Sequence, residues 1–341
     1  MSSVSQGLSR GERAPDFVLP DEEGSPVRFY SRAGGRPVVL LFYDGLGGKE
    51  LCRFSEALNP SGDSDLSVFG VQGKSNQPGA SAPFQVFFDE QGKVRQAYRL
   101  EDGGPAFLFV LDSNLRVIGS VTYAGARSSS DEALSIIQAS QVHREVVEVT
   151  AQVPALFIPN VLDLEICQFL IQVWGTRDNV ETGVERSHGA RREDALSPEA
   201  KRRRDHIVAD EKLLKMLTST IGRRVMPEVQ RSFAYSATRF EGFKVACYDS
   251  QTGGFFQAHR DNLSPSTTHR RFALTLNLNE DYEGGRLRFP EFGPMLYMPG
   301  AGEALVFSCS HLHEVTEVTQ GRRFTLLSFL FGAEDTRAPK Q

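Results

Sequence analysis

Apolar positions are arranged differently in the two halves of the chain. In the first half, residues 37–43 form an uninterrupted apolar run bounded by glycines, which predicts a strand buried on both faces. Strands of this kind belong to parallel or mixed sheets that are covered by helices, so the pattern indicates an α/β domain. The other elements expected in this half are strands at 66–71, 85–88 and 107–111, a hairpin over 112–121 and a helix over 131–139.

The second half begins with helical spacing and continues with many short strands. Apolar residues recur at helical intervals from Leu162 to Val173, with Asp163 as the candidate N-cap, and residues 211–221 predict a second helix. From residue 233 onward, short apolar segments joined by Gly and Pro turns predict an all-β sandwich or barrel. The polar stretch 176–204 between these parts is expected to form a long loop of the kind that covers a site.

These patterns divide the chain into two domains. A length of 341 residues suits two hydrophobic cores, and 40% apolar with 24% charged residues is ordinary for a globular protein. The expected parts are a disordered start (1–10), an α/β domain (11–141), a linker (142–156), a β domain (157–332) and a tail (333–341).

Charge and cysteine content narrow the classes of function. A net charge of −5 gives no electrostatic reason to expect nucleic acid as a partner, and the basic run from Lys201 to Arg204 is interpreted as a solvated loop or helix end. No apolar run approaches the roughly 20 residues that cross a bilayer, and the first residues lack the pattern of a leader peptide. We therefore expect no membrane partner and a cytoplasmic location. The four cysteines are far apart, which indicates neither a disulfide framework nor a structural zinc site.

The candidate chemistry lies in the second half. His259 and Asp261 are two residues apart at an expected strand end, so their side chains share one face, and His313 follows on a later strand. Two imidazoles and one carboxylate are the ligand set of a non-haem Fe(II) centre with open positions. Arg323 follows His313 by ten residues, and its guanidinium fork suits a carboxylate. His311 is a competing ligand, but only His313 has this spacing to Arg323.

Five blocks of the second half, in the same order, resemble the Fe(II)/2-oxoglutarate dioxygenases of the prolyl 4-hydroxylase branch. The resemblance covers about residues 157–332 and implies a double-stranded β-helix (jelly-roll) with flanking helices. It implies that His259, Asp261 and His313 hold Fe(II) as the catalytic centre and that Arg323 binds the far carboxylate of 2-oxoglutarate. The blocks are residues 244–248, 256–262, 276–281, 284–289 and 312–323.

The same resemblance suggests further contacts and a reaction. Tyr248, Thr325 and Asn277 are expected to contact the cosubstrate, and ascorbate is a candidate reductant. The reaction would release succinate and CO2 and hydroxylate a peptidyl residue, with proline as one candidate, or a small molecule. Phe256 and Asn277 stand where relatives of this kind often have tyrosines. The resemblance therefore implies the same type of reaction, whereas it leaves the substrate and the oligomeric state open.

The first half resembles the peroxiredoxins and related thioredoxin-fold domains. The resemblance rests on residues 14–17, the strand at 38–43, and Gly104-Pro105 leading into residues 107–112. In that family the proline before this strand is usually cis, and Pro105 lies at the expected place. The resemblance therefore implies an α/β thioredoxin-like fold.

Cys52 lies about where the reactive cysteine of a peroxiredoxin belongs. Gly45, Lys49 and Ala106 stand where that family has its supporting Pro, Thr and Arg residues, so we expect a module for substrate or partner binding. Lys49 and Arg53 are still cations that could lower the pKa of the thiol. Two alternatives stay open: a thiol-dependent peroxidase that uses Cys52, and a non-catalytic binding module whose barrel retains the metal site.

Overall fold

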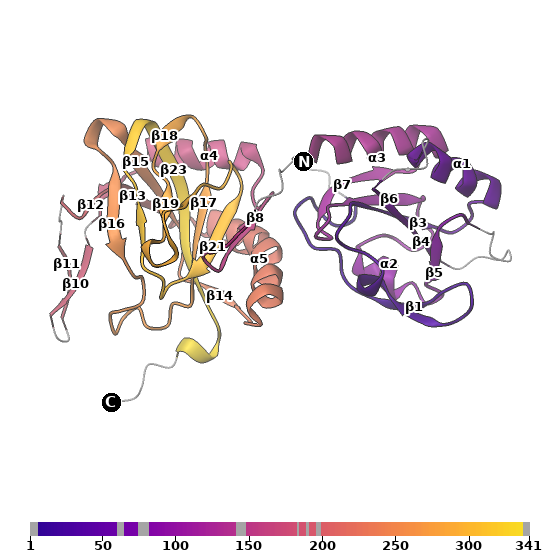
Figure 1. Ribbon diagram of the computed structural model, residues 1–341, viewed down its shortest axis with the longest axis horizontal. Helices are drawn as coiled ribbons and strands as arrows, with labels where there is room; N and C mark the ends of the chain where they lie inside the picture. The colour runs from indigo at the N-terminus through magenta and orange to yellow at the C-terminus, as the bar shows by residue number, and fades with distance from the viewer. Residues whose placement is uncertain are drawn as a thin grey trace. The chain divides into compact units, whose positions relative to one another are not determined.

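The computed structural model describes residues 6–59, 65–73, 82–140, 148–182, 184–188, 191–195 and 199–336. Between residues 183 and 198 it describes no side chains. The chain divides into two compact units, Met1–Val146 and Val147–Gln341 (Figure 1). Each unit is described by itself below.

The first unit is built on a five-stranded sheet with the order β5-β4-β3-β6-β7. The central strand β3 is buried along its whole length, as its apolar sequence predicts. Strands β4 and β5 continue the sheet in parallel, and β6 and β7 continue it antiparallel on the other side. The strands are β3 (Val38–Tyr43), β4 (Ser67–Gln72), β5 (Gln85–Phe88), β6 (Phe107–Leu111) and β7 (Val117–Thr122).

Helices cover both faces of this sheet because neighbouring residues of β3 point to opposite sides. On one face, Leu41 packs in a core cluster with Phe54 of α1 and Ile137 of α3. On the other face, Phe42 packs with Phe17 and with residues of α2. Figure 1 shows α1 and α3 on one side of the sheet and α2 on the other. These elements are α1 (Gly48–Leu58), α2 (Lys93–Ala97), α3 (Ala126–Ser140), the hairpin of β1 (Val18–Pro20) and β2 (Pro26–Arg28), and the 3-10 turn η1 (Phe29–Ser31). The sequence did not predict α1 or α2, and α3 starts five residues earlier than expected.

Two other expectations for the first unit are wrong. The expected disordered start is ordered from residue 6, because Leu8 is buried in the same cluster as Phe42; residues 1–5 lie outside the described residues. The described chain contains no cis peptide bond, so the bond that precedes Pro105 is trans.

The second unit contains two facing antiparallel sheets. The larger has the order β8-β21-β17-β23-β15-β13-β9, and β14 and β18 also pair with β23; the smaller has the order β12-β16-β22-β19-β20. The larger sheet consists of β8 (Ala155–Ile158), β9 (Val180–Glu181), β13 (Arg204–Ile207), β14 (Arg239–Phe240), β15 (Lys244–Asp249), β17 (Phe272–Asn277), β18 (Tyr282–Gly284), β21 (Ala304–Ser308) and β23 (Val318–Phe331). The smaller consists of β12 (Lys201–Arg202), β16 (Phe255–His259), β19 (Leu287–Arg288), β20 (Leu296–Tyr297) and β22 (His313–Val315).

Two helices, α4 (Leu164–Thr176) and α5 (Glu211–Phe233), pack against the larger sheet (Figure 1). Asp163 occupies the N-cap position of α4, as predicted. Helix α5 continues well beyond the expected end at residue 221, although it contains Pro227. Its later turns are retained because Val225 and Val229 are fully buried in the core cluster that includes strands of the larger sheet. Tertiary packing thus outweighs the helix-breaking tendency of proline.

Three expected boundaries of the second unit differ from the structure. Strand β8 pairs with β21 and extends the β domain to residue 155, inside the expected linker. Residues 333–336 of the expected tail include the turn η4 (Glu334–Thr336), where Asp335 accepts hydrogen bonds from Arg271 and Tyr235. The described part of 176–204 is not a loop, because it contains β9, β12 and the hairpin of β10 (Val184–His188) and β11 (Arg191–Ala195). Residues 1–5, 141–147 and 337–341 lie outside the described residues.

None of the helices in the described ranges has the length and apolar character needed to span a membrane.

Candidate metal centre and cosubstrate pocket

The two predicted histidine ligands meet because their strands are neighbours. Strands β16 and β22 pair antiparallel in the smaller sheet, with His259 directly opposite His313. The centroids of the two imidazole rings are 4.3 Å apart. Asp261 follows the end of β16, where its N–H donates to the carbonyl of Cys309 at 3.0 Å. Strand register therefore brings together residues that are far apart in the sequence.

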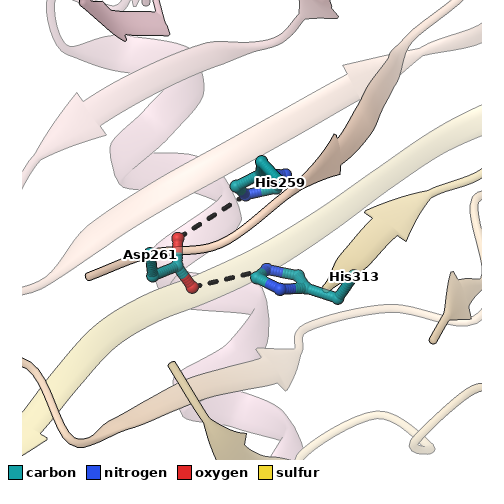
Figure 2. Close-up of side chains that lie close together, drawn as sticks. All are labelled: His259, Asp261 and His313. Carbon is teal, nitrogen blue, oxygen red and sulfur yellow. Dashed lines mark ion pairs between the residues drawn. The ribbon is translucent and has the colours of Figure 1, made fainter. Parts of the chain in front are cut away.

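Figure 2 shows that the carboxylate of Asp261 lies beside the two imidazoles and directs one oxygen toward each of them. Its Oδ1 is 3.5 Å from Nε2 of His259, and its Oδ2 is 3.3 Å from Nε2 of His313. One ligand atom from each residue lies within 4.8 Å of the others. Among the described residues, these three form the one cluster of His, Cys, Asp and Glu with this property.

Hydrogen bonds to the backbone orient both imidazoles. Nδ1 of His259 lies 2.8 Å from the carbonyl of Gln257, and Nδ1 of His313 lies 3.0 Å from the carbonyl of His311. With the proton on Nδ1, each ring directs its Nε2 lone pair toward Asp261, which is the usual way to fix a metal-binding tautomer. Two neutral imidazoles and one carboxylate that converge in this way fit a divalent iron ion.

The charge states of the cluster also suit a cation. Burial alone would raise the pKa of Asp261, but the nearby His313 and His259 outweigh it and lower the pKa to about 2. Burial lowers the pKa of His313, although Asp261 acts in the opposite direction. A carboxylate that stays ionised and an imidazole that stays neutral at pH 7 are the forms that bind metal.

His311, the competing ligand, is not part of the cluster. Its ring packs edge-on against Phe292 with a centroid distance of 5.0 Å. Its backbone carbonyl instead accepts the hydrogen bond from His313. The structure therefore supports the choice of His313 that the ten-residue spacing suggested.

Arg323 is buried and lies in the strand next to Tyr248. It is 2% exposed, and β15 pairs with β23 so that Tyr248 is opposite Arg323. Its guanidinium donates to Oδ1 of Asn277 at 3.2 and 3.3 Å and to Oγ1 of Thr275 at 3.5 Å. These neutral acceptors orient the guanidinium without neutralising it, so its charge remains available for an anion.

The other three residues that were predicted to contact the cosubstrate lie near Arg323 but differ in their exposure to the cavity. Tyr248 lines the cavity and its hydroxyl accepts from Arg203 at 3.3 Å. Thr325 also lines the cavity, but its hydroxyl donates to the carbonyl of Leu276 at 2.9 Å. Asn277 is fully buried and is absent from the cavity lining; its role in the structure is to hold Arg323. Direct contact of these residues with the cosubstrate stays a prediction.

A cavity of about 700 Å³ contains this cluster and reaches residues that the sequence did not single out. Lys201, Arg203, Asp205 and Ile207 all line it, while the residues between them do not. The basic run was interpreted as solvated, which is wrong for Lys201, because Lys201 is 6% exposed. Every second residue from 201 to 207 therefore faces the cavity, and this period of two is the strand signal from which the shared face could have been predicted.

A second ion pair lies beside the metal ligands. Arg270 donates to both carboxylate oxygens of Glu241, at 2.7 and 2.5 Å, and to the carbonyl of Asp261 at 3.2 Å. Both side chains line the cavity. Arg270 therefore connects Glu241 to the backbone of a predicted metal ligand.

The cysteines give no comparable cluster. Cys52 is exposed and lies in the second turn of α1, and the neighbouring Arg53 forms an ion pair with Glu50 at 3.8 Å. The other three cysteines are buried, and burial raises the pKa of Cys167 to about 11 and that of Cys247 to about 12. These three thiols are core residues.

Comparison with known families agrees with both resemblances. Residues 243–331 match the family model of the 2OG-Fe(II) oxygenase superfamily, and residues 10–118 match that of the AhpC/TSA family. The expected fold classes are confirmed: a thioredoxin-like first domain and a 2-oxoglutarate oxygenase fold of the jelly-roll type in the second. The family model of the second domain implies Fe(II) and 2-oxoglutarate.

Individual relatives match one domain each. The chain is 31% identical over 118 residues to peroxiredoxin Q, chloroplastic, of Sedum lineare, which is 32% of this chain and 61% of that protein. It is 30% identical over 93 residues to a PKHD-type hydroxylase of a Synechococcus strain, which is 25% of this chain and 41% of that protein. A solved prolyl-4-hydroxylase of Pseudomonas putida is 18% identical with a TM-score of 0.41, covering 54% of this chain and 94% of that structure.

Proposed function

We propose that this protein is an Fe(II)- and 2-oxoglutarate-dependent dioxygenase. It would hydroxylate a C–H bond of a peptidyl residue, with proline as one candidate, or of a small molecule, and release succinate and CO2. The observation that carries the proposal is the convergence of His259, Asp261 and His313 in the same cavity as the buried Arg323. The match of residues 243–331 to the 2OG-Fe(II) oxygenase model supports it.

His259, Asp261 and His313 would hold Fe(II). When bound by three protein ligands, the ion supplies open positions for 2-oxoglutarate and dioxygen. The protein contributes the orientation of these ligands, because the carbonyls of Gln257 and His311 fix both imidazole tautomers. Phe256 stacks on His259 with a centroid distance of 3.6 Å and covers one face of that ring.

Arg323 would bind the far carboxylate of 2-oxoglutarate. Its guanidinium is held by Asn277 and Thr275, so the fork is already oriented before the anion arrives. A buried guanidinium gains more from a bidentate carboxylate than an exposed one, because little water competes. Burial and orientation together make Arg323 the anchor of the cosubstrate.

Tyr248 would donate to the cosubstrate from the cavity wall. Its hydroxyl oxygen already accepts a hydrogen bond from Arg203, so its own proton is directed elsewhere. A positive charge next to the phenol also strengthens it as a hydrogen-bond donor. Tyr248 would therefore orient the cosubstrate through this hydrogen bond.

The proposal is tested by spectroscopy under anaerobic conditions. The purified protein is loaded with Fe(II) and 2-oxoglutarate, and we expect the visible metal-to-ligand charge-transfer band of a chelated cosubstrate. The matched variants are His313→Ala and His311→Ala, because both remove an imidazole two residues apart in the same segment. Loss of the band in the first and its retention in the second is the expected result. A wild-type protein without the band, or a His313→Ala variant that keeps it, contradicts the proposal.

Turnover separates the enzyme from a binding module that merely retains the metal. We expect oxygen uptake and succinate release in equal amounts in the presence of ascorbate, the proposed reductant. Untargeted mass spectrometry of candidate peptides and metabolites for a gain of one oxygen atom would then identify the substrate. A stable charge-transfer band without any succinate under oxygen would favour the binding module.

A further inference from the structure

Asp261 differs from the two histidines because it lies outside the paired strands. His259 is the last residue of β16 and His313 is the first of β22, whereas Asp261 belongs to the segment that leads to β17. Its backbone is held on both sides: its N–H donates to the carbonyl of Cys309 at 3.0 Å, and its carbonyl accepts from Nη1 of Arg270 at 3.2 Å. The second bond comes from a side chain, so the position of Asp261 depends on how firmly that side chain is fixed.

The guanidinium of Arg270 is itself held in one orientation. Arg270 is 8% exposed, and its Nε and Nη2 donate to the two carboxylate oxygens of Glu241 at 2.7 and 2.5 Å. The guanidinium carbon lies 4.0 Å from the centroid of the Phe329 ring. A bidentate carboxylate fixes the plane of a guanidinium, and an aromatic ring stacked against it restricts that plane further. Nη1 is then directed at the carbonyl of Asp261.

Arg270 joins this metal ligand to the larger sheet. Phe329 belongs to β23, and Glu241, which lies between β14 and β15, donates its N–H to the carbonyl of Phe329 at 2.9 Å. Both histidine ligands belong to the smaller sheet. Arg270 therefore holds Asp261 from one sheet, while the imidazoles are held by the other. The distance from the carboxylate to the imidazoles depends on this contact as well as on the strand pairing.

We propose that Arg270 is a positioning residue of the metal centre, which holds the carboxylate of Asp261 at the correct distance from the two imidazoles. This inference rests on the proposed function, because it concerns the same metal site. Groups that orient metal ligands without binding the metal change its affinity by about 10–100-fold when they are removed. Arg270 acts on the metal only through Asp261, and Glu241 acts only through Arg270.

The test is the affinity for Mn(II), which is stable in air and binds nitrogen and oxygen sites less tightly than Fe(II). Its dissociation constant is measured on the full chain without cosubstrate, from the electron paramagnetic resonance signal of the free ion. The variant is Arg270→Met combined with Glu241→Gln. The net charge is then unchanged and neither charge stays buried alone, so a change in affinity reports the geometry of the ligands. We expect the dissociation constant to rise about 10–100-fold.

The matched control removes the neighbouring pair of an arginine and a carboxylate. Arg271 donates to Oδ1 of Asp335 at 2.7 Å, and neither residue lines the cavity. Arg271→Met combined with Asp335→Asn makes the same kind of change next to Arg270 without altering the backbone contact of Asp261. We expect this control to bind Mn(II) as tightly as the wild type. Denaturant unfolding of the metal-free proteins is compared in parallel, so that any loss of stability is known for both variants.

Chemical rescue separates positioning from a general loss of stability. Arg270→Ala leaves space that opens into the cavity, because Arg270 lines it. Guanidinium ion at millimolar concentration can then donate to Glu241 and to the carbonyl of Asp261 in place of the missing side chain. We expect it to restore the Mn(II) affinity of this variant and to leave the wild type unchanged. Tetramethylammonium has the same charge but no N–H to donate, so it should not restore the affinity.

Any of four results overturns the inference. These are a wild type that binds no Mn(II), a variant of Arg270 and Glu241 that binds Mn(II) as tightly as the wild type, an equal loss in the control, or an Arg270→Ala variant that guanidinium does not restore better than tetramethylammonium. If Arg270→Ala does not fold, the double variant and its control are sufficient. Failure of the proposed function looks different: Mn(II) binding still depends on Arg270, but Fe(II) with 2-oxoglutarate gives no charge-transfer band in the wild type.

Discussion

Asn277 contributes to the site by holding the side chain of Arg323. The resemblance suggested a direct cosubstrate contact, whereas in the structure Oδ1 of Asn277 accepts from Arg323. Its Nδ2 donates to the hydroxyl of Tyr282 and to the carbonyl of Pro299, each at 2.7 Å. The amide is therefore fixed at both ends and holds the guanidinium in one orientation.

Asn277→Ala is expected to weaken cosubstrate binding through Arg323. Loss of a hydrogen bond to a charged group costs about 1.5–3 kcal/mol, so the half-saturating 2-oxoglutarate concentration should rise about tenfold or more. The measurement is an anaerobic titration of the charge-transfer band. Asn262→Ala is the control, because that amide donates to Oγ of Ser310. Equal titrations for the two variants would show that Asn277 does not position Arg323.

Glu241 gives a prediction about pH. Burial would raise its pKa, but Arg270 and His269 outweigh it, and the pKa is lowered from its usual value of 4.5. A carboxylate whose pKa is lowered by folding stabilises the folded state above its unfolded pKa and loses this contribution as the pH falls through the folded value. We expect Glu241→Gln to lower the free energy of unfolding by about 2 kcal/mol at pH 7.

The pH dependence of this difference is the decisive measurement. Denaturant unfolding of wild type and Glu241→Gln is compared from pH 7 to pH 3. The full difference should persist down to about pH 5, because Glu241 is ionised there in both folded and unfolded chains. It should then shrink as the pH falls below 4.5. A difference that does not change with pH would mean that the loss has another cause than the ion pair with Arg270.

At the scale of elements, the turn between β18 and the smaller sheet depends on glycine. Gly284 has φ +72°, and a Cβ at this position would lie 2.1 Å from the carbonyl oxygen of Glu317, which is main chain and cannot easily move. Gly242 has φ +76°, but a Cβ there would meet nothing within 4 Å. Alanine variants of the two glycines therefore distinguish the cost of backbone strain alone from the added cost of steric overlap.

We expect Gly242→Ala to cost about 1–2 kcal/mol, the usual price of a left-handed conformation. Gly284→Ala should cost more than about 3 kcal/mol, because the overlap adds to the strain and displaces β18 from β23. Denaturant unfolding measures both values. Equal costs for the two variants would show that the backbone near Glu317 can relax.

The elements that the sequence missed have physical reasons. Helix α5 passes Pro227 because buried contacts of Val229 hold its last turns, and such contacts are not visible in local propensity. The segment 176–204 contains few apolar residues, so its short strands give no alternating hydrophobic signal. They are held by pairing with other strands: β12 with β16, and β9 with β13. Polar strands of this kind are recognisable only after the sheets exist.

At the scale of the whole molecule, the site belongs to one of two compact units. All residues that line the cavity lie between Val180 and Phe329, in the second unit. We expect calorimetry to resolve two unfolding transitions, because each unit has its own core. Anaerobic Fe(II) with 2-oxoglutarate should raise the temperature of only one transition, since a ligand stabilises the unit that binds it. A shift of both transitions would contradict independent unfolding.

The role of the first unit is tested through Cys52. Cys52 is exposed in the second turn of α1, and Arg53, one of its two candidate cations, pairs with Glu50 at 3.8 Å. The peroxidase alternative stays a prediction. We expect Cys52→Ser to change neither the charge-transfer band nor the consumption of hydrogen peroxide with a thiol reductant. Peroxide consumption by the wild type that disappears in Cys52→Ser would instead favour the peroxidase.

The sequence by itself determined an α/β and an all-β domain, most strands of the first sheet and the candidate site residues His259, Asp261, His313 and Arg323, because these depend on periodicity and spacing along the chain. The thioredoxin-like and jelly-roll classes followed from the family resemblances. Only the tertiary structure decided that His311 packs against Phe292, that Asn277 holds Arg323, and that Lys201 and Arg203 line the cavity. Each of these three features depends on which face of a strand is turned toward the cavity and on which strand lies next to it. Pairing between strands that are distant in sequence fixes that choice, and no local pattern encodes it.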